Sequence, residues 1–497
     1  MFPWLVLLVP ALLPTSLSLS LRMSSKSNVV IIGSGPTGLA AAIMLARRGF
    51  TGIKVFDRLS QPPSPSDASV WANFVNPRSY NIGLSSRGQN ALIELGVLDT
   101  IMKYTVDVVG RKDWSPETKI DEPIETVYTD RTYPTRVLQR DRLAGALLEE
   151  ILDKYKDAVE VSFKTECESI QWLNLGKADE RCRLTLKDTS GGAPLFSYVE
   201  SPLVIGADGA NSVIRESMAK TSPKHQFQIR SFEDKNVRVY RTIPLHFPND
   251  PKKWRKDLNW SVRLKSDINM DALPTKEGVF LGVVLYRPWD DRINSLRTKE
   301  DAKTFFNTYF PMFTPCLKLE DMERFAQMKP STFTRFSYCG PKLHKGKSTV
   351  LLGDCIHTVK PFFGLGVNSA FEDVTTLGRS LEKHNYDISK ALEDYSKSRA
   401  PETKALVTMS KQLDGGFLLF ILPLILDSIL HKAFPFIFSP NTISSMQNEK
   451  KTFVQVARRK FMDRIMQLAL LSTILTGISR FLMLSLRAAR AVLSLKR

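Results

Sequence analysis

The feature that most constrains the fold is a glycine-rich turn between two apolar runs near the start of the chain. Residues 28–58 read NVVIIGSGPTGLAAAIMLARRGFTGIKVFDR. Val29 to Ile32 is a continuous apolar run, as in a buried parallel strand, and the helical pattern after the turn leads to a second strand ending before Asp57. Strand, turn, helix and strand in this order predict a βαβ unit of an α/β fold.

Three glycines in that turn predict a dinucleotide-binding site. Gly33, Gly35 and Gly38 give the spacing GxGxxG directly between strand and helix. The first permits the tight turn, the second lets a pyrophosphate approach the backbone, and the third lets helix and strand pack closely. The helix N-terminus attracts the phosphates. Asp57 lies where an acid binds the adenosine ribose, and the fingerprint occurs once, so we expect one nucleotide-binding domain.

The rest of the chain predicts a mixed architecture. Residues 140–155 have the pattern of an amphipathic helix, and residues 201–218 hold a second apolar strand that ends in Gly-Ala-Asp-Gly. Residues 225–340 instead contain strand-like stretches separated by Pro and charged turns, with a helix at 299–310. We therefore expect a mostly antiparallel sheet inserted within the nucleotide-binding domain.

The charge is concentrated in the C-terminal tail. The net charge is +18, from 69 basic and 51 acidic residues, and from Lys450 onward eleven basic residues stand against one acid, Asp463. A local excess of this kind favours an anionic membrane surface over a nucleic-acid partner. Residues 417–426 are apolar but too short to span a bilayer. Residues 465–486 are longer and interrupted by Arg480, which predicts an amphipathic or tilted anchor.

The N-terminus and the cysteines indicate the compartment. An apolar run from Phe2 to Leu13 predicts a targeting or anchor segment over residues 1–27, directed to the endoplasmic reticulum, a plastid or the mitochondrial outer membrane. The five cysteines are scattered and odd in number, which predicts reduced thiols rather than a disulfide framework or a zinc site. The six histidines have no metal-ligand spacing, so no metal is predicted.

A second informative stretch, LLGDCIHTVKPFFGLGVNSAFEDV, covers residues 351–374. Asp354 stands at the carboxyl end of a predicted strand, where open α/β sheets bind ligands, and its carboxylate can accept hydrogen bonds from a polyol chain. Gly364 and Gly366 let the backbone approach a flat ring. The N–H groups of the helix that begins near Val367 would stabilise negative charge on that ring.

Together with ADGANSVIR at 207–215, these motifs resemble the FAD-dependent aromatic hydroxylases of the para-hydroxybenzoate hydroxylase-like group. Within that group, RSYNIGLSSRGQNAL (78–92), FFNTYFP (305–311) and PFFGLGVNSAFED (361–373) are most similar to kynurenine 3-monooxygenases. The resemblance implies a Rossmann-like FAD domain of the glutathione reductase type. Its parts would be residues 28–110, 136–220 and 341–405, with a substrate domain at 111–135 and 221–340 and a helical, membrane-associated region at 406–497.

The resemblance also implies site residues. FAD would be bound by Gly33, Gly35, Gly38, Asp57, Arg58, Arg140, Asp208 and Asp354 and by the turn formed by Gly364, Leu365, Gly366, Val367 and Asn368. The small-molecule substrate would be reached by Arg111, Tyr128, Phe362 and Phe363. No side chain is predicted to act as a catalytic acid, base or nucleophile, and His357 is interpreted as structural.

The implied reaction is oxygen transfer. NADPH would reduce FAD, and O2 would then give a flavin C4a-hydroperoxide that hydroxylates L-kynurenine at the 3-position. Leu365 stands where kynurenine 3-monooxygenases commonly have Gln, and residues 405–417 lack the Tyr expected to hold the amino-acid carboxylate. Three alternatives therefore stay open: an epoxidase of a membrane-dissolved isoprenoid, a reductase of the geranylgeranyl reductase type, and a non-catalytic flavin-binding scaffold.

Overall fold

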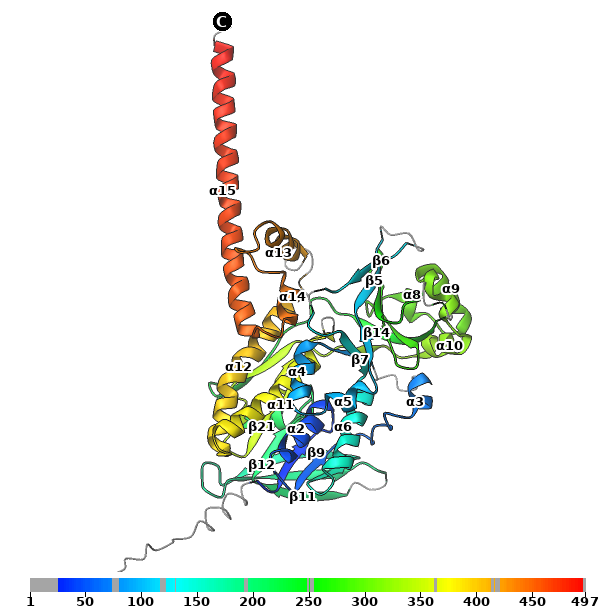
Figure 1. Cartoon of the computed structure of the whole chain (residues 1–497), viewed down its shortest axis with the longest axis vertical. Coiled ribbons are helices and arrows are strands. Elements are labelled where there is room, and N and C mark those ends of the chain that lie inside the picture. Colours follow the sequence, from blue (N-terminus) through cyan, green and yellow to red (C-terminus); the bar gives the residue numbers. More distant parts are fainter. Residues whose placement is uncertain are drawn as a thin grey trace, which may run out of the picture.

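The computed structural model describes residues 26–73, 80–116, 122–129, 131–191, 195–247, 250, 254–361, 364–412, 415 and 421–494. An α/β body lies beside a β-sheet domain, and one long C-terminal helix extends away from both (Figure 1). The mixed α/β architecture predicted from the sequence is confirmed. The N-terminal apolar run, Phe362 and Phe363 lie outside the described residues.

The body is built on a six-stranded sheet in the order β20-β21-β12-β1-β2-β8. Its strands are β1 (Val29–Ile32), β2 (Ile53–Phe56), β8 (Val159–Ser162), β12 (Leu203–Gly206), β20 (His344–Lys345) and β21 (Thr349–Leu351). β1 pairs in parallel with β2 and β12, and β12 pairs in parallel with β21. The carboxyl ends of these strands therefore meet at one edge, which gathers the turns containing Gly33, Asp57, Asp208 and Asp354.

Helices and a three-stranded sheet surround this sheet. The helices are α2 (Pro36–Ala46), α3 (Ala68–Asn73), α4 (Ser86–Glu94), α5 (Leu98–Met102), α6 (Arg140–Lys154), α7 (Val213–Thr221), α11 (Gly366–Lys383) and α12 (Ile388–Gln412). The antiparallel sheet joins β9 (Thr165–Leu173), β10 (Arg181–Asp188) and β11 (Phe196–Ser201). α2 packs against α6 and α11. Residues Leu39–Leu45 are fully buried, as expected for a helix that is apolar on every side.

Two small sheets connect the body to the β-sheet domain. One contains β3 (Asn81–Leu84), β7 (Thr135–Gln139) and β4 (Val106–Val108). The other contains β13 (Phe227–Ser231), β19 (Ser337–Pro341) and β22 (His357–Thr358). β22 follows the short 3-10 turn η2 (Gly353–Cys355), so this second sheet lies next to Asp354.

The β-sheet domain has seven strands in the order β18-β14-β17-β16-β15-β5-β6. They are β5 (Gly110–Trp114), β6 (Ile124–Val127), β14 (Val239–His246), β15 (Leu258–Arg263), β16 (Asn269–Pro274), β17 (Val279–Tyr286) and β18 (Ser331–Thr332). All pairs are antiparallel except β15 with β5. The helical segments α8 (Asp291–Asn294), α9 (Lys299–Tyr309), η1 (Pro311–Cys316) and α10 (Leu319–Gln327) enclose an aromatic core that includes Trp114, Trp260 and Phe313.

The tail contains α13 (Leu422–Ala433), α14 (Thr442–Gln447) and α15 (Phe453–Ser494). The base of α15 is docked on the body, because Glu402 of α12 accepts hydrogen bonds from the backbone N–H groups of Phe453 (2.6 Å) and Val454 (3.3 Å). The upper part stands clear of the rest of the chain (Figure 1). Within the described residues, α15 is the one helix long and apolar enough to cross a membrane, over Phe453–Arg487.

Candidate functional site

The three glycines of the turn have two different roles: Gly33 and Gly38 allow close packing of the backbone, and Gly35 borders a space that a ligand can enter. A Cβ on Gly33, whose φ is +103°, would lie 2.3 Å from the carbonyl oxygen of Ala207, and one on Gly38 would lie 1.9 Å from the carbonyl oxygen of Gly33. Neither position can hold a side chain. A Cβ on Gly35 would meet only the Arg140 guanidinium, at 3.5 Å. The space before Gly35 is therefore open and bounded by a positive charge.

The first turn of α2 faces that space. Gly35 is the N-cap and provides no side-chain cap, so the N–H groups of the turn have no intrahelical partner. The helix dipole adds partial positive charge at this end. Open backbone beside free N–H donors and a guanidinium is the donor set that a pyrophosphate requires, so these residues fit the phosphates of FAD.

Asp57 is fixed beside the same turn. Its Oδ2 accepts hydrogen bonds from the backbone N–H (2.6 Å) and hydroxyl (3.0 Å) of Ser34, and its Oδ1 accepts one from the N–H of Leu59 (2.8 Å). Arg58 is exposed and forms a 3.6 Å ion pair with Glu166. The structure thus brings Asp57 to the glycine turn, whereas the Arg58 side chain extends toward β9.

Arg140 and Tyr80 form the next part of the site. The backbone N–H of Arg140 donates to the carbonyl oxygen of Tyr80 (3.0 Å), and its guanidinium pairs with Asp141 (2.9 Å). Burial opposes the charge of Arg140, but Tyr80, Asp141 and Asp354 outweigh it and raise the pKa of the guanidinium. Burial raises the pKa of Tyr80 to about 12, against the opposing effect of Arg140. At neutral pH, Tyr80 is therefore a neutral phenol beside a permanent cation.

The carboxylate of Asp354 can be reached by a ligand, but it is poorly hydrated. Its side chain is exposed, yet the protein around it limits hydration and raises the pKa of the carboxyl, although His357 and Arg140 act in the opposite direction. No residue in the described part of the chain donates a hydrogen bond to it. An accessible carboxylate without a protein donor, close to Arg140, is suited to accept hydrogen bonds from a bound polyol.

The N-terminus of α11 supplies further donors. Gly364 has a φ of +61°, and Leu365 is the N-cap without a side-chain cap. The backbone N–H groups of Gly366, Val367 and Asn368 consequently have no intrahelical partner. Three N–H groups and the helix dipole can together stabilise negative charge on a group placed before them.

The side chains of this turn point elsewhere. The Asn368 amide donates to the carbonyl oxygens of Gly83 (2.9 Å) and Gly364 and accepts from the N–H of Ser85 (3.0 Å). The Leu365 side chain is buried in an apolar cluster with Leu406, Met409, Met446, Phe453 and Val456, which we call the tail cluster. Val367 packs partly against the core of the body. Only the backbone of these residues is left for a ligand.

Asp208 anchors the loop that precedes α7. Its carboxylate accepts hydrogen bonds from the N–H of Val213 (2.7 Å) and the thiol of Cys355 (3.3 Å). Cys355 follows Asp354 directly in η2. Asp208 therefore links two of the turns at the sheet edge, and its carboxylate is already occupied by protein donors.

Sequence reasoning missed a buried network beneath Asp354. Asp373 of α11 accepts hydrogen bonds from the N–H of Gly353 (2.8 Å), from His357 (2.9 Å) and from Arg399 of α12. Burial acts to raise the pKa of Asp373, but Arg399 and His357 outweigh it and lower the pKa. The network holds the turn that carries Asp354, in agreement with the structural interpretation of His357. The signal was present, because Asp373 ends the stretch that carried the resemblance.

The predicted substrate residues Arg111 and Tyr128 lie on neighbouring stretches of backbone, because Arg111 of β5 is opposite Thr126 of β6 and the N–H of Tyr128 donates to the carbonyl oxygen of Val109 (2.9 Å). Arg111 is exposed on β5 and pairs with Asp113 (2.7 Å), whereas the ring of Tyr128 lies under the Arg131 guanidinium at 3.7 Å. Among the contacts of the described residues, neither touches Arg140, Tyr80 or Asp354.

An aromatic pair nearer to Tyr80 was not predicted. Tyr240 of β14 stacks on Phe333 with ring centroids 4.8 Å apart. Tyr240 is also close enough to Tyr80 to contribute to its raised pKa. The stacked pair of Tyr240 and Phe333 therefore lies in the neighbourhood of Tyr80. Tyr80 lies in the 78–92 segment that carried the resemblance, which is the signal that could have found it.

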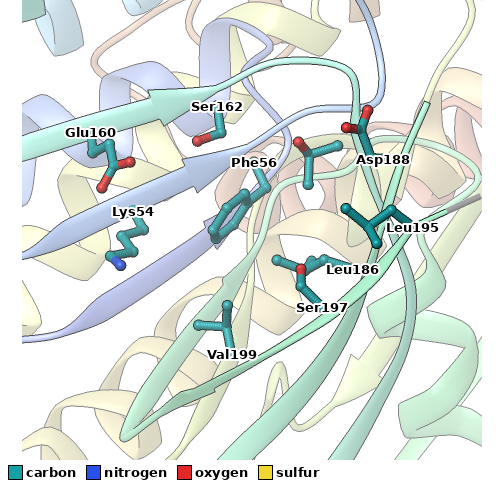
Figure 2. A pocket seen from close by; sticks show the side chains of 10 residues that line it. Lys54, Phe56, Glu160, Ser162, Leu186, Asp188, Leu195, Ser197 and Val199 are labelled. Atoms are coloured by element: carbon teal, nitrogen blue, oxygen red, sulfur yellow. The ribbon is translucent and has the colours of Figure 1, made fainter. Parts of the chain in front are cut away.

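A separate cavity of about 330 Å³ lies between β2, β8 and the β9–β11 sheet (Figure 2). Lys54, Glu160 and Asp188 surround an apolar floor that includes Phe56 and Leu186. None of the predicted site residues lines it. We assign the site to the sheet edge at Gly35, Arg140 and Asp354 instead.

Comparison with known proteins identifies the family. A family model described as "FAD binding domain" matches residues 26–410. The chain belongs to this family. Its members bind FAD, and the open backbone at Gly35 and the accessible carboxylate of Asp354 fit that cofactor.

Curated relatives and solved structures agree with the family. Kynurenine 3-monooxygenase of Salinispora tropica is 29% identical over 392 residues, covering 78% of this chain and 79% of that protein. The protein of the same name from Cryptococcus neoformans var. neoformans serotype D is 26% identical over 427 residues, covering 79% of this chain and 78% of that protein.

The fold is similar to that of 2-methyl-3-hydroxypyridine-5-carboxylic acid oxygenase in its tetrameric form, with a TM-score of 0.59, 18% identity and coverage of 83% of this chain and 98% of the other. It is also similar to Pseudomonas aeruginosa PqsL in complex with 2-aminobenzoylacetate, with a TM-score of 0.56, 17% identity and coverage of 78% and 95%. The chain is an FAD-dependent monooxygenase of the kynurenine 3-monooxygenase type.

Proposed function

We propose that this monooxygenase uses NADPH and O2 to hydroxylate L-kynurenine at the 3-position. The observation that carries the proposal is the set of curated relatives of that name, which match nearly four fifths of the chain. The stacked aromatic pair of Tyr240 and Phe333 in the neighbourhood of Tyr80 supports an aromatic substrate.

Our assignment of the cofactor residues follows from their free groups and, for Asp57, from its place beside the glycine turn. The first turn of α2 and Arg140 would hold the pyrophosphate, Asp57 the adenosine ribose, and Asp354 the ribityl chain. The N–H groups of residues 366–368 would face the flavin ring. Bound FAD would supply the redox chemistry, by accepting hydride from NADPH and activating O2.

The protein side of the mechanism is electrostatic. The α11 N-terminus would stabilise the negative charge that a reduced flavin ring carries, because its donors are fixed before the reaction begins. Tyr80 keeps its proton at neutral pH and can donate a hydrogen bond without changing its charge. Arg140 offsets the charge of the phosphates. None of these proposed roles uses a nucleophile or a general base.

Leu365 bears on the isoprenoid alternative. The replacement of Gln by Leu at this position suggested an apolar substrate. The Leu365 side chain is, however, buried in the tail cluster with Phe453 and Val456, so it does not offer apolar surface to a substrate. This argument for an isoprenoid epoxidase is therefore removed.

We also propose that α15 anchors the enzyme in a membrane. The segment 468–486 is exposed on every side, and its large side chains are almost all apolar. Its length is about 29 Å at 1.5 Å per residue, close to the hydrocarbon thickness of about 30 Å. Arg480 lies about two turns from Arg487 and can extend toward the far headgroups.

The test uses the full-length protein in detergent, loaded with FAD. NADPH oxidation is followed with and without L-kynurenine, and products are analysed by mass spectrometry. We expect stimulated oxidation and a product heavier by one oxygen atom. A product heavier by two hydrogen atoms from an isoprenoid would indicate the reductase, and a flavin-loaded protein that never oxidises NADPH would indicate the scaffold.

A further inference from the structure

The helix α13 and the turn after it expose an unusual number of large apolar side chains. Phe436 is 98% exposed. The other exposed members of this surface, which we call the α13 surface, are Ile421, Leu422, Ile425, Leu426, Ile429, Phe434 and Ile437. A contiguous exposed apolar surface of this size marks an interaction site.

The opposite side of α13 is fixed to α15 by a buried charge. Asp427 is fully buried, and its carboxylate accepts hydrogen bonds from Lys460 (2.9 Å), Arg464 (2.8 and 3.0 Å) and Gln467 (2.9 Å). The three donors lie on one stripe of α15, because they are spaced by four and three residues. α13 is thus held beside the lower part of α15 (Figure 1).

The position of this clamp along α15 is informative. Gln467 is the last donor, and the segment that is exposed on every side begins at the next residue, Leu468. If α15 spans a bilayer, as proposed above, the near boundary of the hydrocarbon lies at this level. The α13 surface therefore stands at the depth where amphipathic helices bind, about 5–10 Å into the boundary between headgroups and acyl chains.

The charges around α13 fit the same partner. Lys432, Lys450, Lys451, Arg458 and Arg459 are exposed at this end of the body. Asp427 and Asp463 are buried and both accept hydrogen bonds from Lys460 (2.9 and 3.3 Å), and the half-buried Glu449 accepts one from Thr132 (2.7 Å), so the basic side chains outnumber the accessible acid. The rim of the apolar surface is therefore positive, which favours anionic headgroups.

We propose that the α13 surface inserts into the headgroup region of the membrane that α15 crosses. The inference rests on the proposed membrane anchor and extends it to a second element. Continuity with the span and the basic rim favour lipid over a second copy of the chain. The two elements α13 and α15, joined through Asp427, would then fix the orientation of the enzyme on the bilayer, which a single helix would not do.

Single cysteine variants of the full-length, FAD-loaded protein can test this. All five native cysteines are buried, so an added surface cysteine can be labelled selectively with the environment-sensitive fluorophore NBD. Phe436→Cys reports on the α13 surface and Leu475→Cys on the span. Tyr198→Cys on β11, where the tyrosine is also exposed, is the matched aromatic control. Retained flavin absorbance shows that each variant is folded.

The labelled proteins are reconstituted into vesicles of phosphatidylcholine with phosphatidylserine, and quenchers are placed at shallow or deep positions of the acyl chains. We expect the emission of NBD attached at residue 436 to rise severalfold and to be quenched best by the shallow quencher. NBD at residue 475 should be quenched best by the deep quencher, and the emission of NBD at residue 198 should not change. If the label at residue 475 enters the acyl chains while the label at residue 436 remains in water, α15 is a membrane anchor but the α13 surface does not insert. If both stay aqueous, membrane association itself is wrong. Emission at 436 that depends on protein concentration in detergent, without vesicles, would assign the surface to a second copy.

Discussion

Asp354 and Asp373 lie nineteen residues apart in one motif, and their surroundings differ completely. Asp373 is buried and accepts hydrogen bonds from Gly353, His357 and Arg399, which lower its pKa. Asp354 is accessible, has no donor among the described residues, and has a raised pKa. The comparison separates a carboxylate that maintains the fold from one that the fold leaves available to a ligand. Four experiments test this difference.

The largest effect is expected from Asp373→Ala. Removing this carboxylate leaves the Arg399 guanidinium buried without its main partner, which costs about 3–5 kcal/mol. Urea unfolding of the FAD-free protein should show the loss. Asp394→Ala is the matched control, because Asp394 pairs with Lys383 near the surface, where an ion pair is worth about 1 kcal/mol or less. Equal losses in the two variants would remove the structural role of Asp373.

Asp354→Ala should weaken FAD binding without destabilising the fold. We expect unchanged or slightly higher stability of the FAD-free protein, since a desolvated carboxylate is removed. FAD binding should weaken about 10- to 100-fold, because hydrogen bonds to a charged acceptor contribute about 1.5–3 kcal/mol. The flavin absorbance of the purified protein and a titration with FAD measure both. A variant that purifies with a full complement of flavin would show that Asp354 does not face the cofactor.

Gly38 and Gly35 should differ in the same way as Asp373 and Asp354, one being needed for the fold and the other for FAD binding. Gly38→Ala places a methyl group against the carbonyl oxygen of Gly33 and should destabilise the protein by about 1–3 kcal/mol even without FAD. Gly35→Ala meets only Arg140 at an ordinary distance, so it should leave the FAD-free protein intact and reduce FAD affinity. Thermal unfolding with and without FAD distinguishes them. Equal destabilisation of the FAD-free proteins would contradict an open space at Gly35.

The smallest effect is a difference in pH dependence. The lowered pKa of Asp373 means that its carboxylate stabilises the fold fully above the unfolded value of about 4, and that this contribution is lost only as the pH falls below that value through the lower pKa of the folded state. The raised pKa of Asp354 means that its ionisation destabilises the FAD-free protein at neutral pH, and that this penalty disappears on acidification.

Asp354→Asn should therefore be more stable than the natural chain at pH 7 and equal to it near pH 4, whereas Asp373→Asn should stay less stable across that range. Urea midpoints at several pH values check both signs. Parallel curves for the two variants would mean that the carboxylates are in equivalent surroundings.

The sequence predicted the parts of the site that local motifs determine. The glycine turn, Asp57 and Asp354 are each placed by a strand end and the residues directly after it. The motif could not tell which of its polar side chains are already used. Asn368 was predicted to contact the cofactor, but the sequence did not show that its side-chain amide bonds to Gly83 and Ser85, nearly 300 residues earlier in the chain, which leaves only its backbone N–H for a ligand.

Two other features depended on tertiary contacts in the same way. The apolar run 417–426 gave no sign that α13 continues to Ala433 with a charge inside, because Asp427 is tolerated only through partners on α15. β16 contains Asp271 and Pro274, residue types that are depleted in strands, so its sequence alone gives a weak strand signal. The alternating burial of β16 becomes evident only once it lies between β15 and β17.

The position of Leu365 has a consequence for exchanging parts between relatives. This residue belongs to the turn proposed to face the flavin, and its side chain is enclosed by Phe453 and Val456 at the base of α15. The cofactor turn and the C-terminal helix therefore share one small core. A chimaera that takes its tail from a relative should therefore also need the residue of that relative at position 365, because the two segments pack against each other.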